Sequence, residues 1–135
     1  MGYNPVMRIL IVDDDDAFAE IASTLLGTAG DIEVAGRARN GREAIDRAAE
    51  LEPDVILMDI DMPIMDGVEA TRRIMEGGFR GRVVVVSGSD VTAHITGVRR
   101  AGAVAYLRKS RIAEDLLTVL DALRPPPGTG PRAPA

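Results

Sequence analysis

The sequence predicts an α/β domain in which helices cover both faces of a parallel β-sheet. Short strand-like runs recur along the chain, and a segment with apolar side chains at helical spacing follows each of them. This alternation occurs five times, which favours parallel strands joined by crossover helices. With 135 residues, the chain has the length of one domain.

The first predicted strand, residues 7–12, is followed by an acidic run, residues 13–16. Asp16 is expected to cap the next helix, because an aspartate at this position accepts a hydrogen bond from an unpaired backbone N–H group. Apolar residues at helical spacing continue this helix to about Leu26, and the glycines that follow end it.

The second and third strands are predicted on either side of a capped helix. Residues 32–38 alternate between two faces, which is typical of a half-exposed edge strand. Asn40 and Glu43 have the spacing of a capping box, and the helix that they open stops before Pro53. Residues 55–59 form an apolar run that predicts a fully buried strand with a carboxylate at its end.

The rest of the chain repeats this pattern. Asp66 and Glu69 have the cap spacing at the start of a third helix, which two glycines close. The remaining predicted elements are a β-branched strand at 83–86, a helix at about 91–100, a strand at 104–107 and a last helix at about 113–123.

Composition excludes several classes of protein. The sequence holds 16 basic and 21 acidic residues, and its net charge of -5 argues against non-specific nucleic-acid binding. Without cysteine it forms neither disulfides nor thiolate metal sites. No apolar stretch has the length of a membrane span, and the first residues lack the layout of a signal peptide. A cytoplasmic protein is expected.

The domain is expected to occupy residues 1–124. Residues 125–135 are rich in proline and glycine and contain no core-forming side chains. Such a segment cannot bury enough apolar surface to fold, so a disordered or extended tail is predicted.

Parallel strands bring their carboxyl ends to one edge of a sheet, where ligands of open α/β sheets bind. Asp13 and Asp14 follow the first strand, Asp59 ends the third, Ser87 follows the fourth and Lys109 follows the fifth. Crowded carboxylates repel one another unless a cation lies between them, and Mg²⁺ prefers carboxylate, water and phosphate oxygens. A carboxylate can also act as a nucleophile toward phosphorus, and Asp59 is placed best for that role.

Four motifs in this order resemble the receiver domain of two-component response regulators. They are I-L-I-V-D-D at 9–14, D-x-x-M-P-x-M-D-G at 59–67, V-V-V-S-G at 84–88 and A-G-A-x-x-Y-L-x-K at 101–109. The resemblance covers about residues 7–123 and is similar in extent to the single-domain chemotaxis type. It implies a flavodoxin-like, doubly wound sheet of five parallel strands in the order 2-1-3-4-5, with five helices.

The resemblance also implies a role for each acidic residue. Asp59 matches the phosphoacceptor, and Asp13 and Asp14 match the acidic pair that holds Mg²⁺. Of that pair, Asp14 corresponds to the direct ligand. The backbone carbonyl of Asp61 completes the ligands that the protein supplies.

Further positions match the switching machinery of the family. Ser87 falls at the switch hydroxyl, Lys109 at the lysine that contacts the phosphoryl group, and Tyr106 at the aromatic switch. A histidine kinase or a histidine phosphotransfer protein donates the phosphoryl group in this family. The receiver promotes its own phosphorylation and dephosphorylation, so it is a signalling switch rather than an enzyme with a separate substrate.

The sequence departs from the family pattern at three positions. Ser110 follows the lysine where many receivers have a proline after a cis peptide bond, and a cis bond before a non-proline residue costs about 2.5–4 kcal/mol. The geometry that places Lys109 is therefore open. Asp61 adds negative charge at a position that influences the rate of dephosphorylation in the family. The sequence does not indicate whether the rate rises or falls. Gly88 follows the switch serine and loosens that loop.

Other functions fit parts of the pattern. A haloacid-dehalogenase-like phosphatase also uses a strand-end D-x-D, here Asp59 to Asp61, but on an early strand of a longer chain. A flavodoxin-like FMN carrier needs hydroxyls and glycines in the loop where this chain has aspartates. A pseudo-receiver would bind partners without phosphorylation.

The output is expected to be the binding of a protein partner, through the face formed by the fourth helix and the last two strands. Nucleic-acid and membrane binding are not expected, and dimerisation on phosphorylation stays open.

Overall fold

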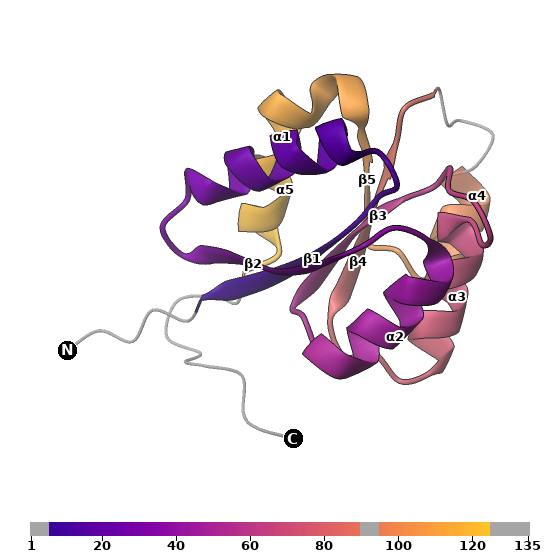
Figure 1. Cartoon of the computed structure of the whole chain (residues 1–135). Helices are drawn as coiled ribbons and strands as arrows, with labels where there is room; N and C mark the ends of the chain where they lie inside the picture. Colours follow the sequence, from indigo (N-terminus) through magenta and orange to yellow (C-terminus); the bar gives the residue numbers. More distant parts are fainter. Residues whose placement is uncertain (1–5, 90–94, 125–135) are drawn as a thin grey trace.

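The computed structural model describes residues 6–89 and 95–124, in which five strands alternate with five helices (Figure 1). The elements are β1 (Met7–Val12), α1 (Asp16–Gly27), β2 (Ile32–Ala38), α2 (Gly41–Leu51), β3 (Val55–Asp59), α3 (Gly67–Glu76), β4 (Arg82–Ser87), α4 (Ile95–Ala101), β5 (Ala105–Arg108) and α5 (Ile112–Ala122). The expected tail at 125–135 lies outside the described residues.

All neighbouring strands are parallel, and their order is β2-β1-β3-β4-β5. This confirms the predicted doubly wound, flavodoxin-like topology. Helices α1 and α5 cover one face of the sheet, and α2, α3 and α4 cover the other (Figure 1). Each face has its own aliphatic cluster, and the sheet lies between the two clusters.

The central strands are the most deeply buried part of the molecule. Every residue of β3 is buried, and so are all residues of β1 except the half-buried Arg8. Strands buried on both faces are continuous apolar runs, as the sequence indicated. The acidic residues at the carboxyl ends of these strands therefore lie next to the buried centre of the sheet.

The caps of α2 and α3 confirm two predictions and that of α1 corrects one. Asn40 and Asp66 cap α2 and α3 as expected. At α1 the cap is Asp15 rather than Asp16, because the Asp15 carboxylate accepts the N–H groups of Ala17 and Phe18. The side chain of Asp16 instead pairs with Arg37 in β2 and with Arg39 just after that strand.

The edge strand β2 departs from simple alternation. Its register against β1 shifts after Ile9, which pairs with Val34, whereas Leu10 pairs with Gly36. Ala35 is therefore an extra residue in the ladder, as in a β-bulge. The burial along β2 does not alternate for this reason.

The last part of the chain places Lys109 without a loop. Described residues of α4 begin at Ile95, and the predicted helical residues 91–94 lie outside the described part. After β5, one 3₁₀ turn, Lys109–Arg111, runs directly into α5. No peptide bond among the described residues is cis, so the Lys109–Ser110 bond is trans.

Candidate functional site

Asp59 is the buried acid at the end of the central strand β3. Its side chain is only 3% exposed, although it is ionisable. Burial, reinforced by the negative charge of Asp13, raises the pKa of Asp59 to about 7, and the positive charge of Lys109 opposes this shift. Near neutral pH, Asp59 is therefore only partly ionised, because the fold holds its carboxylate where a negative charge is unfavourable.

Asp13 and Asp14 follow β1, which lies beside β3. Asp13 is buried, and its carboxylate accepts the backbone N–H of Asp15 at 2.8 Å, whereas Asp14 is exposed. One carboxylate oxygen from each of Asp13, Asp14 and Asp59 lies within 4.8 Å of the others. Three hard oxygen donors at this spacing, one of them open to solvent, fit Mg²⁺. The donor set suits that ion and no soft metal.

Lys109 supplies the positive charge of the site. Its Nζ lies 2.8 Å from Oδ2 of Asp13 and 3.6 Å from Oδ1 of Asp59. Burial acts to lower the pKa of Lys109, but the bond to Asp13 and the charge of Asp59 outweigh it and raise the pKa above its usual value. The ammonium group thus remains charged beside both buried acids.

The other predicted positions lie around this centre. Ser87 ends β4, next to Asp59 in the sheet, and its buried Oγ accepts the backbone N–H of Ser89 at 3.1 Å. Asp61 is exposed just beyond Asp59. Tyr106 lies in β5, half buried, and packs against the cluster on the α2, α3 and α4 face. Tyr106 thus lies on the edge strand β5, partly exposed beside this cluster.

A family model for the response regulator receiver domain matches residues 9–121. The chain belongs to this family. Receiver domains of response regulators act in two-component signalling. Within the part of the chain that the structure describes, no helix is long and apolar enough to cross a membrane.

Curated proteins and solved structures resemble this receiver over most of its length. It is 38% identical to the nitrate/nitrite response regulator protein NarL of Escherichia coli, over 83% of this chain and 52% of that protein. It is 44% identical to a protein-glutamate methylesterase/protein-glutamine glutaminase of Pseudomonas aeruginosa, over 77% of this chain and 28% of the other. The response regulator domain of Thermotoga maritima CheB superposes with a TM-score of 0.81 and 32% identity, covering 87% of this chain and 96% of that one. The receiver thus spans about half or less of its curated relatives.

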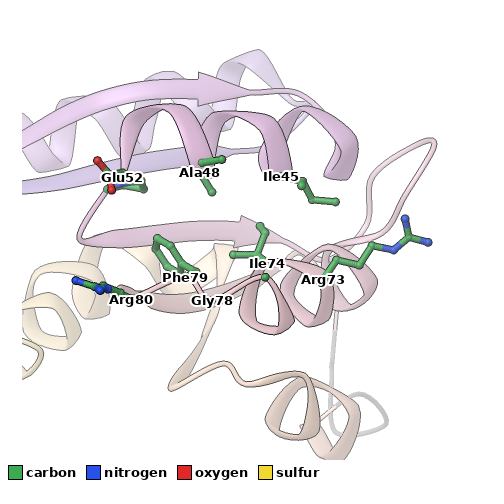
Figure 2. A pocket seen from close by; sticks show the side chains of 11 residues that line it. Ile45, Ala48, Glu52, Arg73, Ile74, Gly78, Phe79 and Arg80 are labelled. Carbon is green, nitrogen blue, oxygen red and sulfur yellow. The ribbon is translucent and has the colours of Figure 1, made fainter. Parts of the chain in front are cut away.

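A groove of about 240 Å³ lies between α2 and α3, away from the acids (Figure 2). Ala48 and Ile74 form part of its apolar lining, and Phe79 and Glu52 lie where the chain approaches β4 and β3. These are the amino ends of the strands, whereas the acidic residues lie at the carboxyl ends. The groove is separate from the receiver's acidic site.

Two residues of the site were missed by the sequence analysis. The guanidinium group of Arg37 donates to the Asp13 carbonyl at 2.8 Å, and the Phe18 ring lies beside Lys109. Arg37 stands at the carboxyl end of β2, so the strand-end rule, had it been extended to this strand, would have found it. Nothing in the sequence indicates the contact of Phe18, because it depends on how α1 lies over the sheet.

Proposed function

We propose that this receiver accepts a phosphoryl group on Asp59 from a histidine kinase or a histidine phosphotransfer protein. The observation that carries the proposal is the buried Asp59 carboxylate, with the acids Asp13 and Asp14 and the ammonium group of Lys109 around it. No other group of acids in the described residues lies this close together at the carboxyl edge of the sheet. The arrangement supports phosphoryl transfer because that reaction depends on positioning and on neutralising charge.

In the proposed reaction, a carboxylate oxygen of Asp59 attacks the phosphorus atom. The new O–P bond forms while the bond from phosphorus to the donor breaks. A phosphohistidine donor leaves as imidazole and takes up a proton, whereas acetyl phosphate leaves as acetate. Lys109, already beside Asp59, then pairs with the phosphoryl oxygens and stabilises the added negative charge.

Asp13, Asp14 and Asp59, with the backbone carbonyl of Asp61, would hold Mg²⁺, and Asp14 would be a direct ligand. When bound, Mg²⁺ offsets the charge of these carboxylates and of the phosphoryl oxygens. The exposure of Asp14 and the spacing of the three carboxylates support this assignment. The same machinery would later hydrolyse the phosphoryl group, so the chain acts as a switch.

Ser87 is proposed to bond a phosphoryl oxygen after release from its contacts with Ser89. Tyr106 would then change rotamer within its half-buried site on β5. The face made by α4, β4 and β5 would present this change to a protein partner. We assign the receiver to residues 1–124 and a Pro/Gly-rich tail to residues 125–135. We further propose a cytoplasmic location and no contact of the receiver itself with nucleic acid or membrane. A phosphorylation-dependent homodimer is an alternative output.

Two alternatives would use the same residues differently. A pseudo-receiver would bind partners without taking up phosphate, and a haloacid-dehalogenase-like phosphatase would use Asp59 and Asp61 on a substrate. The second is disfavoured because Asp59 ends the third strand, and the last strand leads to Lys109 rather than to further acids.

Incubation with acetyl phosphate, followed by Phos-tag gel analysis or intact mass, tests the proposal. We expect one added phosphoryl group in Mg²⁺, none in EDTA, and none in Asp59→Asn. Asp46→Asn, which changes an exposed carboxylate on α2, is the matched control and should react like wild type. Phosphate uptake by Asp59→Asn would overturn the assignment, and no uptake by wild type would favour the pseudo-receiver.

A further inference from the structure

Phe18 lies in the first turn of α1, and its side chain is 7% exposed in the cluster beneath α1 and α5. Its backbone N–H donates to Oδ1 of Asp15 at 3.2 Å, and the N–H of Asp15 donates to Oδ1 of Asp13 at 2.8 Å. The hydrogen bonds that place Asp13 therefore also place Phe18. The first turn of α1, which carries Phe18, is thus linked to the Asp13 carboxylate through Asp15.

The Lys109 ammonium group lies over the face of this ring, with Nζ 4.6 Å from the ring centroid. That distance is well within the ~6 Å at which a cation is attracted by an aromatic face. The same nitrogen pairs with Asp13 and Asp59, and the lysine side chain is 20% exposed. Three groups thus surround one ammonium group, and two of them are anions.

We propose that Phe18 is a positioning residue for Lys109, and that its ring face keeps the ammonium group at the site when the carboxylates change partners. This inference rests on the proposed phosphoacceptor role of Asp59. When Asp13 and Asp59 are engaged by other charges, their attraction for Lys109 falls. An aromatic ring attracts the cation without carrying net charge, so it neither neutralises Lys109 nor repels an incoming phosphoryl group.

Packing alone would also place a large apolar residue at position 18, because the side chain is part of the α1 and α5 core. The two roles differ in what they require of the ring. A core position needs shape and volume, whereas attraction of a cation needs the negative electrostatic face of the ring. The test therefore has to change the charge distribution of the ring and preserve its shape.

Stepwise fluorination meets this requirement. Phe18 is replaced in the full chain by 4-fluoro-, 3,5-difluoro- and 3,4,5-trifluorophenylalanine, and phosphorylation by acetyl phosphate in saturating Mg²⁺ is timed. We expect a graded fall in rate, reaching about fivefold for the trifluoro ring, and about tenfold for Phe18→Leu. The sequence contains one other phenylalanine, Phe79, which lines the groove far from Lys109 and is the matched control. Fluorination of Phe79 should leave the rate unchanged.

Proton NMR supplies a readout that does not depend on the reaction. In wild type, the ε-methylene protons of Lys109 should show an upfield ring-current shift, which Phe18→Leu removes. An equal rate at every degree of fluorination, or a Lys109 signal without a ring-current shift, would overturn the inference. Wild type that takes up no phosphate would contradict the proposed function alone, because the NMR measurement still tests the contact.

Discussion

Asp59 is both buried and ionisable, so the stability of the folded protein depends on pH through this residue. Its pKa is about 7 in the folded state, whereas an unfolded chain has a value near 3.8. The folded state therefore binds more protons between these two values. The free energy of unfolding falls as pH rises through this window and levels off above about pH 7.

Replacing Asp59 with Asn removes this titration. In EDTA, we expect Asp59→Asn to match wild type in stability near pH 4 and to exceed it at pH 8 by on the order of 2 kcal/mol, because the buried charge is gone. Urea denaturation of both proteins across this pH range measures the difference. A difference that stays constant from pH 4 to pH 8 would contradict the raised pKa.

The residue scale also shows where prediction from sequence ends. Asp13, Asp59 and Lys109 were predicted to meet because each follows a parallel strand, and strand ends share one edge. The contact of Phe18 with Lys109 was not predicted, because it depends on how α1 is rotated over the sheet. The spacing of apolar residues does not determine that rotation. Ile64 was not singled out either, yet it has a φ of 73° and is 82% exposed in the loop after Asp59. For a β-branched residue this conformation is strained.

At the scale of elements, the start of α3 holds the end of β3 in place. The N–H of Gly67 donates to the Ile60 carbonyl at 2.9 Å, and a Cβ atom on Gly67 would overlap the carbonyl oxygen of Asp59. Only glycine allows α3 to begin this close to the end of β3.

Gly67→Ala is therefore expected to destabilise the protein by about 2–3 kcal/mol and to slow phosphorylation, because the backbone of Asp59 must move. Gly97→Ala is the matched control. Gly97 is exposed in α4, its nearest neighbour to a new Cβ is 3.9 Å away, and alanine there should stabilise the helix by about 0.5–1 kcal/mol. Thermal melts of both variants test the contrast, and similar effects of the two substitutions would count against it.

The starts of helices were predicted correctly where the sequence offers only one side chain that can cap the helix. Asn40 and Asp66 are single acceptors ahead of their helices, and both predictions hold. At α1, any of several consecutive aspartates satisfies the cap pattern, and the choice of Asp15 depends on Arg37 and Arg39 drawing Asp16 toward β2. Whether Asp16 caps the helix or pairs with these distant arginines cannot be predicted from the local sequence pattern.

At the scale of the whole molecule, the acidic edge is a site of charge repulsion that the fold tolerates. Three carboxylates from two central strands gather there, and within the described residues Lys109 is the cation that pairs with two of them. The order of the sheet follows from the alternation of strands and helices together with the family motifs. This order places β1 beside β3 and so brings their carboxylates together. Most of the site could therefore be predicted together with the fold.

Binding of Mg²⁺ should therefore stabilise the entire domain. At a concentration tenfold above the dissociation constant, we expect the free energy of unfolding to rise by about 1.4 kcal/mol in wild type, because only the folded state brings the carboxylates together. Asp14→Ala should lose this gain. Thermal melts in MgCl₂, compared with NaCl at equal ionic strength, measure it, and equal stabilisation of the variant would argue against the acidic site.

β5 and α5 are joined only by a 3₁₀ turn of three residues. Arg108 is the last residue of the strand, Lys109 lies in the turn, and the buried Ile112 is the first residue of the helix. An added residue would turn Ile112 by about 100° around the helix axis, or move Lys109 away from Asp13. Surface loops elsewhere accept changes of length readily. In the evolution of this gene, substitutions between 108 and 112 should accumulate freely at exposed positions, whereas insertions and deletions there should be eliminated.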